Sequence, residues 1–539
     1  MARFVSKSDL KLPGWFWRPS LALLSGLTAG PALPRAGIWP LIFVSVFLLV
    51  WSIRRVGFWA GYGIGFLGGA AFYASQSVWM SAYLGPEPWL ALAVLEGLIC
   101  GFAVGAMALI WRNHGVNAYR LGIWDKPLLI SALSLAWVAR EWLCGHLPYG
   151  GYQWSRLGQP VVGTIFERWA YWGGISAVSL AVAAIAITFV VAIDAITVSS
   201  LSKKLFQPSF SSASTVLMLA PALIALLVPI FTVVPSGDSG KTVKVAAVQG
   251  NANAGLFANP VPGSILAKHV RESKVLAKDP KARGLDFVVW PENASDQDPL
   301  TNSMAALEVY QVSNQLLKAP LFVGTVTWKG DNAFNSVLLF DPNKPKVAVY
   351  NKRRPVPFAE YVPDRPFWFA IAPDLIGLIN HGFTAGKAPG IFSVAGTKVG
   401  SLICFEIGID DLSHDLVTGG AKLILSQANN SDFGHTDETF QQESLARLQA
   451  ISTGRAVVHV STVGVTELIL PDGRITKHIP AFKPGYVIGR LPLSGSVTPA
   501  MRFYGWVDAI ALGSIGLLLA FAFAAWVTSA SKKFSRRRA

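Results

Sequence analysis

Charged residues are scarce in this chain. They make up 14% of its 539 residues, whereas about 25% is usual for a soluble protein, and hydrophobic residues make up 52%. This balance excludes an ordinary soluble domain and indicates an integral membrane protein. The net charge of +15 does not indicate nucleic-acid binding, because many of the basic residues flank apolar runs, where they set membrane topology.

Cysteine is equally scarce. The chain has Cys100, Cys144 and Cys404, and the first two fall in or at the end of apolar runs. An odd number at scattered positions argues against a disulfide framework. The sequence has no Cys-x-x-Cys or His-x-x-x-His cluster of the kind that binds zinc, and no glycine-rich phosphate loop before a helix. We therefore expect neither a metal nor a cofactor.

Long apolar runs are abundant. A helix that spans a bilayer needs about 20 mostly apolar residues, and eight runs approach that length: 15–33, 36–53, 57–82, 87–111, 127–145, 169–197, 214–235 and 506–528. The first run is the weakest, because it contains Pro31 and continues into Pro34. Its alternative is the apolar part of a signal peptide, with the segment 29–32 as a poor cleavage site.

Positive charges alternate between the connections as eight spans require. Lysine and arginine gather in the N-terminal segment, in the second, fourth and sixth connections and in the C-terminal tail, while the third connection has none. Since cytoplasmic loops are rich in these residues, we expect both termini in the cytoplasm. The expected regions are a transmembrane region with seven spans (1–235), an extracytoplasmic domain (241–498), an eighth transmembrane helix (506–528) and a basic cytoplasmic tail (529–539).

Ionisable residues also fall inside these apolar runs. Glu96 and Asp194 have no obvious partner in the sequence, and we favour structural positions that face the helix bundle over a transport path. Arg140 and Glu141 are adjacent and can pair. The loop 146–154 after them is rich in aromatic residues and glycine; we favour an interfacial aromatic belt over a wall of a lipid-binding cleft.

The region 241–498 alternates strand patterns with helical patterns, which is typical of a layered α/β domain. The expected helices are 264–277, 302–317 and 437–453, and the expected strands are 243–248, 287–290, 321–326, 337–340, 347–350, 399–403, 423–425, 457–461 and 467–470. Functional groups in such sheets collect beyond the carboxyl ends of strands. Glu292, Lys352 and Cys404 each follow a strand pattern in this way.

Each of these three residues has an ordinary alternative. A lone cysteine after a strand is usually a small buried hydrophobe, Glu292 can cap a helix, and Lys352 can lie in a solvated basic turn. Together they favour a nucleophilic thiol, a carboxylate base and an ammonium that stabilises an oxyanion. The thiol needs the base because it is mostly protonated at neutral pH, and a carboxylate in an apolar pocket has its pKa raised enough to serve.

The motifs around these residues resemble those of the nitrilase superfamily, and more closely those of the apolipoprotein N-acyltransferases. They are Trp-Pro-Glu292, Tyr-Asn-Lys352, Val-Pro-Phe-Ala-Glu360-Tyr-Val-Pro and Cys404-Phe-Glu406. The third is highly specific, and the resemblance covers nearly the whole chain. It implies a polytopic α-helical membrane bundle of eight spans and an extracytoplasmic α/β nitrilase-like αββα sandwich, in the bacterial cytoplasmic (inner) membrane.

The resemblance also implies an activity and roles for individual residues. An acyl chain moves from a membrane phospholipid to the N-terminal S-diacylglyceryl-cysteine amine of an apolipoprotein, through a thioester on Cys404. Glu292 is then the general base and Lys352 the oxyanion stabiliser. The supporting residues are Glu360, Glu406, Asn335 and the Phe405 backbone N–H. We expect these two lipid substrates as partners, no nucleic acid, and a monomer.

Several positions depart from the family pattern. Phe405 stands where tyrosine is common, and Ala359 replaces a common glycine. The tryptophan often found soon after Gln249-Gly250-Asn251 is absent, and Phe257 is the nearest aromatic residue. These departures bear on substrate preference and leave the triad intact.

The segment 365–380 is unusually apolar for a soluble domain. It is either a core helix or a membrane-facing lid through which a lipid reaches the thiol. The candidate substrate-binding residues are Phe367, Trp368, Phe257 and Tyr361. Two rival functions remain open: a membrane-tethered nitrilase-type amidase, and a non-catalytic membrane scaffold.

Overall fold

The computed structural model describes residues 14–202, 212–237, 240–255, 258, 260–379, 381–517 and 520. The chain divides into two compact units. The helical unit draws on Met1–Pro160, Ser179–Ile230 and Trp506–Ala539, and the α/β domain on Val161–Val178 and Phe231–Gly505. Phe257 and the predicted tail 529–539 lie outside the described residues.

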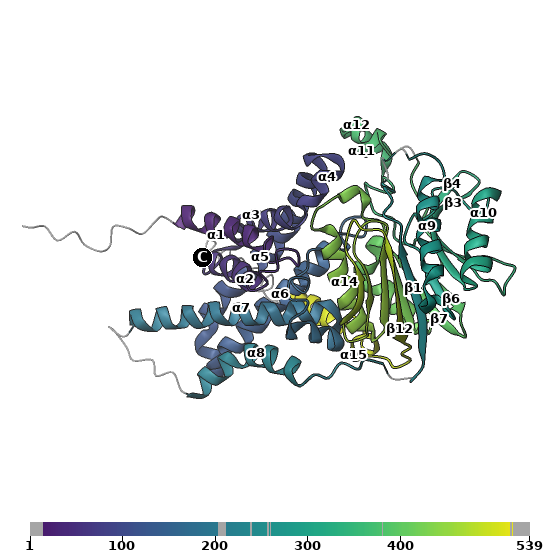
Figure 1. Ribbon diagram of the computed structural model, residues 1–539. Helices are drawn as coiled ribbons and strands as arrows, with labels where there is room; N and C mark the ends of the chain where they lie inside the picture. The colour runs from purple at the N-terminus through teal and green to yellow at the C-terminus, as the bar shows by residue number, and fades with distance from the viewer. Residues whose placement is uncertain are drawn as a thin grey trace, which may run out of the picture. The chain divides into compact units, whose positions relative to one another are not determined.

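The N-terminal part of the chain is helical (Figure 1). Among the described residues, four helical stretches are long and apolar enough to cross a membrane, namely Pro86–Asn113, Gly122–His146, Ile165–Thr197 and Ala213–Phe231. Leu41–Ser52 and Trp506–Leu517 are shorter apolar helices. The remaining spans of the predicted eight stay a prediction. The helices are α1 (Gly14–Ala29), α2 (Leu41–Ser52), α3 (Phe58–Gln76), α4 (Ser81–Leu84), α5 (Pro86–Leu121), α6 (Asp125–His146), α7 (Ala170–Ser202) and α8 (Ser212–Phe231).

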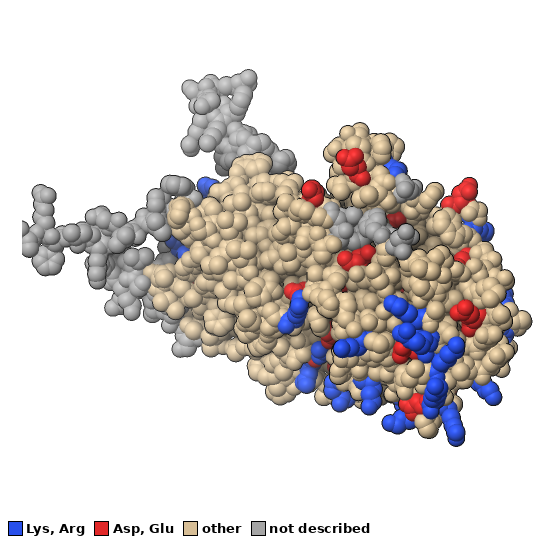
Figure 2. All heavy atoms as spheres, turned by 45° about the horizontal axis from the view of Figure 1, so that its top comes forward, with Lys and Arg blue, Asp and Glu red and all other residues tan. Residues whose placement is uncertain are grey.

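The surface of the molecule reflects this division. On the face in Figure 2, the described surface over the helices is nearly free of Lys, Arg, Asp and Glu, whereas these side chains gather over the α/β domain. Helix α8 exposes Ile224, Leu227 and Ile230, which are each about half exposed. An exposed apolar helix face of this kind is typical of contact with lipid.

Asp194 on α7 has partners that the sequence did not reveal. Its carboxylate lies 2.6 Å from Nη1 of Arg54 and 3.2 Å from Nη2 of Arg55. The sequence offered no obvious partner for Asp194, because the two arginines lie about 140 positions earlier in the chain. Arg140 and Glu141 do pair as predicted, at 3.6 Å, and both are buried.

The α/β domain contains two six-stranded sheets (Figure 1). The first has the order β12-β1-β2-β3-β4-β5 and the second the order β11-β10-β9-β8-β7-β6. The strands are β1 (Thr242–Gln249), β2 (Phe287–Val289), β3 (Leu321–Lys329), β4 (Asn332–Phe340), β5 (Ala348–Asn351), β6 (Ile391–Val394), β7 (Thr397–Ile403), β8 (Leu423–Ala428), β9 (Ala456–Ser461), β10 (Thr466–Ile469), β11 (Ile475–Ile479) and β12 (Gly485–Pro492).

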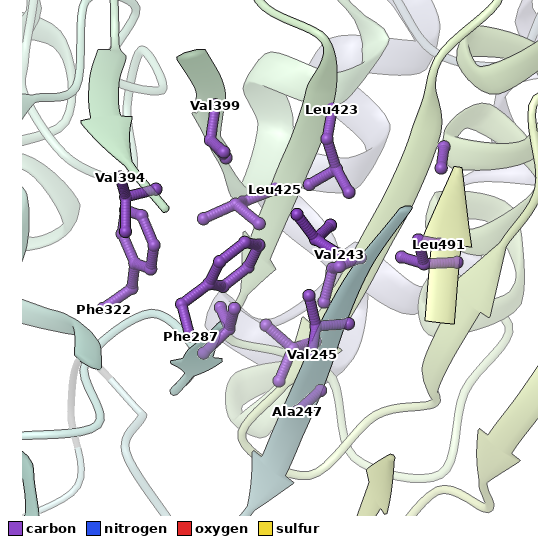
Figure 3. Close-up of a cluster of buried hydrophobic side chains, with 14 of the residues drawn as sticks. Val243, Val245, Ala247, Phe287, Phe322, Val394, Val399, Leu423, Leu425 and Leu491 are labelled. Atoms are coloured by element: carbon purple, nitrogen blue, oxygen red, sulfur yellow. The ribbon is translucent and has the colours of Figure 1, made fainter. Parts of the chain in front are cut away.

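The inner faces of the two sheets form the main core. Figure 3 shows Val245 and Phe287 of the first sheet among Leu425 and Val399 of the second. The rings of Phe287 and Phe322 meet edge to face at 5.6 Å. Each such fully buried side chain stabilises the domain by about 1.5–3 kcal/mol, so this layer holds the two sheets together.

Helices cover the outer faces of both sheets. They are α9 (Ser264–Lys278) and α10 (Ser303–Tyr310) on the first sheet, and α13 (Asp410–Thr418) and α14 (Glu438–Thr453) on the second. In β1, Val243, Val245 and Ala247 face the other sheet while Ala246 and Val248 face the helices. Since both faces of the strand are buried, its sequence is almost continuously apolar. The αββα prediction is confirmed.

Three strands were not predicted, and all three lie at sheet edges. They are β6, β11 and β12. Edge strands contact solvent along one side, and β11 exposes three of its five residues, so the apolar pattern is interrupted there. The predicted strands and helices of 241–498 are all present, with ends shifted by a few residues.

The segment 365–380 forms two short helices, α11 (Arg365–Ile371) and α12 (Pro373–Gly377), as far as it is described. They stand out from the edge of the domain (Figure 1). Phe367 is 59% exposed and Ile371 60% exposed. The core-helix alternative is therefore wrong for α11, which has no buried residue, although Ile376 and Ile379 in and after α12 are buried.

Candidate active site

Cys404 lies at the turn where β7 passes into a short 3-10 helix, Cys404–Gly408. Its φ is +54°, in the left-handed region that non-glycine residues rarely adopt. Such a strained strand-to-helix turn presents a nucleophile at the edge of a sheet. The side chain is partly buried, and Phe405 follows it inside the 3-10 helix.

Glu406 joins this turn to the loop that carries Lys352. Its buried carboxylate accepts hydrogen bonds from the backbone N–H of Ile403 (2.9 Å), Arg353 (2.7 Å) and Arg354 (3.1 Å) and from the Tyr350 hydroxyl (2.8 Å). Four bonds to two separate segments identify Glu406 as a positioning residue. These contacts fit a role for Glu406 in orienting the loop that carries Lys352.

Lys352 is almost fully buried and faces two carboxylates. Its Nζ lies 2.8 Å from Oε2 of Glu360 and 3.8 Å from Oε1 of Glu292. Burial alone would lower the pKa of this ammonium, but the charges of Glu360 and Glu292 outweigh burial and raise the pKa above its usual value. Lys352 is therefore a fixed positive charge at neutral pH.

Asn335, on β4, connects the two carboxylates. Its Nδ2 donates to Oε1 of Glu292 (2.7 Å) and to Oε1 of Glu360 (2.9 Å). Its backbone carbonyl accepts from the N–H of Lys352 (2.8 Å). Asn335 thereby fixes the positions of both acids and of the lysine relative to one another. These contacts fit the supporting role that the resemblance implies for it.

Glu292 follows β2 and is 4% exposed. Burial raises the pKa of its carboxyl, and the charge of Glu360 raises this pKa further, whereas the charge of Lys352 lowers it. The net result is a pKa of about 7. Its Oε2 accepts no hydrogen bond within the described part of the chain. A carboxylate poised near neutral pH with an open oxygen can act as a general base.

Gly324, on β3, makes room for this carboxylate. A Cβ at position 324 would overlap the Pro291 carbonyl and approach the Cα of Glu292. Backbone bonds from Trp290 to Phe322 (2.9 Å) and from Ser295 to Gly324 (3.1 Å) hold the segment between them against β3. The sheet backbone therefore determines where Glu292 sits.

The Cys404 thiol is protonated at rest. Burial raises its pKa well above the ordinary value, and the Glu292 carboxylate raises it further, while Lys352 opposes them. The thiol and Glu292 are thus close enough to affect each other's ionisation. Transfer of the proton to Glu292 makes the nucleophile, and because Glu292 becomes neutral in the same step, the two groups never carry negative charge together.

Three further polar residues surround Cys404 that the motifs did not identify. Gln442 on α14 donates from Nε2 to Cys404 Sγ at 3.6 Å. Asn430 donates hydrogen bonds from Nδ2 to Glu438 and to Gln442. Asn430 follows β8, so the rule that located Glu292, Lys352 and Cys404 also applies to it. Gln442 and Glu438 lie within a helical pattern, and no sequence signal shows which face of that helix meets the thiol.

Three of the candidate substrate-binding residues, Tyr361, Phe367 and Trp368, lie in the segment that follows Lys352. Trp368 packs edge to face on Phe358 at 5.2 Å, and Phe358 belongs to the loop that carries Glu360. Tyr361, in the same loop, is half-buried. Phe367 is exposed, and Phe257 lies outside the described residues. Within the described residues, no group of three or more His, Cys, Asp or Glu side chains could hold a metal ion.

Two family models match the chain. A carbon-nitrogen hydrolase model matches residues 244–498, and an apolipoprotein N-acyltransferase N-terminal domain model matches residues 25–188. An apolipoprotein N-acyltransferase from Mycolicibacterium smegmatis is 31% identical, over 93% of this chain and 84% of its own. Another, from Pseudomonas putida, is 28% identical over 92% of this chain and 96% of its own.

Solved structures that resemble the chain include an amidase from Nesterenkonia sp. It is 16% identical, with a TM-score of 0.36, over 48% of this chain and 94% of the amidase. That likeness is too low to support a conclusion about this protein.

Proposed function

We propose that this chain moves a fatty acyl chain from a membrane phospholipid to a lipoprotein, because it belongs to the apolipoprotein N-acyltransferase family. The acceptor is the amine of the N-terminal S-diacylglyceryl-cysteine. The chain is an acyltransferase with a carbon-nitrogen hydrolase domain. The observation that supports the mechanism proposed below is that Glu292 and Lys352, 3.8 Å apart, both act electrostatically on the Cys404 thiol.

The first half-reaction loads the thiol. Glu292 takes the Cys404 proton, and the thiolate attacks the carbonyl carbon of a phospholipid ester. The Lys352 ammonium and the Phe405 N–H hold the oxyanion that develops. The ester C–O bond then breaks, Glu292 returns the proton to the leaving oxygen, and a lysophospholipid departs from a thioester on Cys404.

The second half-reaction transfers the acyl chain. The lipoprotein amine attacks the thioester carbonyl, Glu292 takes a proton from the nitrogen, and the C–S bond breaks to form the amide. The thiolate regains the proton. Splitting the reaction lets two bulky lipid substrates use one site in turn. We propose that the chain acts as a monomer.

The membrane arrangement belongs to the same proposal. Eight spans, with both termini in the cytoplasm, would place a catalytic domain of residues 241–498 outside the bacterial cytoplasmic membrane, before an eighth span at 506–528 and a cytoplasmic tail. The alternation of basic connections supports this topology. Reporter fusions after residues 54, 112, 240 and 535 test it: activity of a periplasmic reporter is expected only at residue 240.

The exposed apolar segment of α11 and α12 fits a lipid-facing lid. Phe367, Phe369 and Ile371 are each about half exposed or more. The buried active site needs a route for an acyl chain that is held in lipid, and an apolar flap beside the Glu360 loop supplies a surface that tolerates lipid. Trp368 and Tyr361 are proposed to line that route.

Mass spectrometry of the intact chain tests the mechanism. Incubation with phospholipid and no acceptor is expected to add one acyl mass to the Cys404 peptide. Cys404→Ala is expected to remain unmodified, while Cys144→Ala, a matched control in the helical unit, is expected to load normally. An equal adduct on Cys404→Ala would contradict the proposal. Rapid loss of the adduct to water, with no transfer to a lipoprotein, would favour the amidase.

A further inference from the structure

Helix α14 brings an amide group to the Cys404 sulfur. The side chain of Gln442 is fully buried, and its Nε2 lies 3.6 Å from Sγ, within hydrogen-bond range for sulfur. Glu292 and Lys352 come from the first sheet and its loops, whereas α14 covers the second sheet. The thiol therefore receives a contact from an element that contributes nothing to the triad.

Asn430 determines which end of this amide faces the sulfur. Its Nδ2 donates to Oε1 of Gln442 at 2.9 Å, so the oxygen of Gln442 is occupied and the Nε2 hydrogens point to Cys404. Asn430 is itself held at both ends. Its Oδ1 accepts from the Ser461 hydroxyl, and its Nδ2 also donates to Oε2 of Glu438 at 2.5 Å. The Ser461 oxygen accepts from the Gly464 N–H at 2.9 Å, which leaves its proton for Asn430.

The surroundings of Asn430 are built to fit it. Gly464 lies so close that a Cβ there would overlap Oδ1 of Asn430 and Oγ1 of Thr439. Asn430, Ser461, Glu438 and Gln442 are all at most 2% exposed. In a buried network where each donor and acceptor has a defined partner, the amide of Gln442 has a single favoured orientation.

Glu438 completes the network without adding a second negative charge at neutral pH. Burial raises the pKa of its carboxyl to about 8, although the Asn430 hydrogen bond opposes this. The neutral acid still accepts the Asn430 N–H. An ionised carboxylate here would raise the pKa of the Cys404 thiol, as the nearby Glu292 carboxylate does.

We propose that Gln442 is a further catalytic residue, whose Nε2–H donates to the Cys404 sulfur and stabilises its thiolate, and that Asn430 and Glu438 are positioning residues for it. An N–H donor to a charged acceptor is roughly twice as strong as one to a neutral acceptor, so the bond favours the ionised sulfur. In acyl transfer, which rests on the function proposed above, the thiolate occurs twice: as nucleophile in the first half-reaction and as leaving group in the second.

The charged and titratable groups that act on the thiol are Glu292, Lys352, Glu360 and Glu438. Gln442 is neutral at all pH values, so its replacement changes one hydrogen bond and no charge. This makes the ionisation of Cys404 a direct readout of the Gln442 contact.

Gln442→Met tests the inference, because methionine is close to glutamine in size and has no donor. The rate at which iodoacetamide alkylates the Cys404 peptide is measured against pH in the full chain. Loss of the donor is expected to move the midpoint up by about one pH unit, and to slow acyl loading about tenfold at neutral pH. An unchanged midpoint would overturn the inference.

Two further variants separate a hydrogen bond from a packing effect. Gln441→Met changes the adjacent buried glutamine and is expected to leave the alkylation midpoint unchanged; an equal shift in this variant would overturn the inference. Glu438→Gln keeps a neutral acceptor for Asn430 and is expected to stay within about threefold of the wild-type alkylation rate at neutral pH. A loss as large as in Gln442→Met would contradict the positioning role of the neutral acid.

The alkylation assay also separates this inference from the proposed function. It needs no lipid or lipoprotein substrate. If the wild-type chain failed to load an acyl group, the acyltransferase proposal would fail, while a shifted alkylation midpoint in Gln442→Met would still support the thiolate contact.

Discussion

The ammonium of Lys352 lies 2.8 Å from Oε2 of Glu360, and the two side chains are 1% and 12% exposed. The same ammonium is a full ångström farther from Glu292. Glu360 is therefore the main counter-ion, and it leaves Glu292 free to exchange a proton. Removing one member of a buried ion pair costs about 3–5 kcal/mol, because the other charge remains unpaired.

Glu360→Gln is expected to slow acyl loading of Cys404 by about 100-fold or more. Glutamine keeps the size of the side chain but removes the charge that raises the pKa of Lys352, so the ammonium loses its main partner and its fixed position. The loading rate with phospholipid alone is the measurement. Asp364→Asn, at an exposed position four residues later, is the matched control and is expected to load normally. A wild-type rate in Glu360→Gln would show that Glu292 alone can hold the lysine.

Acyl loading is expected to depend on pH through Glu292. Its pKa is raised to about 7, chiefly by burial, and the carboxylate form is the base. The base is therefore present above pH 7 and is lost as the pH falls through 7, so the loading rate should fall about tenfold for each pH unit below 6.5. Rates between pH 5.5 and 8.5 are the measurement.

Glu292→Gln is expected to abolish acyl loading, and with it the fall in loading rate below pH 7. Glu308→Gln on α10 is expected to keep both the loading and its pH dependence. A loading rate that is constant between pH 5.5 and 8 would exclude a base with a pKa near 7.

Phe367→Glu is expected to impair acyl loading without unfolding the domain. Phe367 is 59% exposed on α11, so a carboxylate there remains solvated, but it disfavours contact with lipid. We expect loading from phospholipid vesicles to fall at least tenfold, with little change in thermal stability. Trp368→Glu is expected to act in the same direction.

Val275→Glu is the matched control for these two substitutions. Val275 is 46% exposed on α9, on the outer face of the first sheet, and the variant is expected to load normally. Normal acyl loading in a folded Phe367→Glu chain would contradict the proposal that α11 and α12 form a lipid-facing lid.

Gly324→Ala is expected to reduce activity through the position of Glu292. The added Cβ would overlap the Pro291 carbonyl, so β3 and the Glu292 segment must separate. Such overpacking costs about 1–3 kcal/mol and displaces the base. Thermal stability and loading rate are measured together. Gly377→Ala in α12, where a Cβ meets no atom within 4 Å, is expected to change neither. A wild-type loading rate in Gly324→Ala would show that Glu292 tolerates the displacement.

Much of the α/β domain follows from local patterns. Strands buried on both faces, such as β1 and β8, contain short runs of mostly apolar residues, and they were predicted within a few residues. The edge strand β11 was missed because polar residues at its three exposed positions interrupt the apolar pattern, and in β12 the exposed Arg490 does so. The segment 365–380 looked equally suited to a core, since composition does not tell which side of an apolar helix is covered.

The sequence alone determined the membrane character, the α/β class of the domain and the order of the three candidate catalytic residues. Strand ends are local features, and a residue beyond a strand end can be recognised from its neighbours. The tertiary structure decided the contacts that join distant segments: Asp194 with Arg54, Lys352 with Glu360, Asn335 with both acids, and Gln442 with Cys404. These contacts depend on the direction of each side chain and on its burial. Both properties change the pKa of a group and the orientation of its hydrogen bonds. Neither property can be read from a residue's neighbours along the chain.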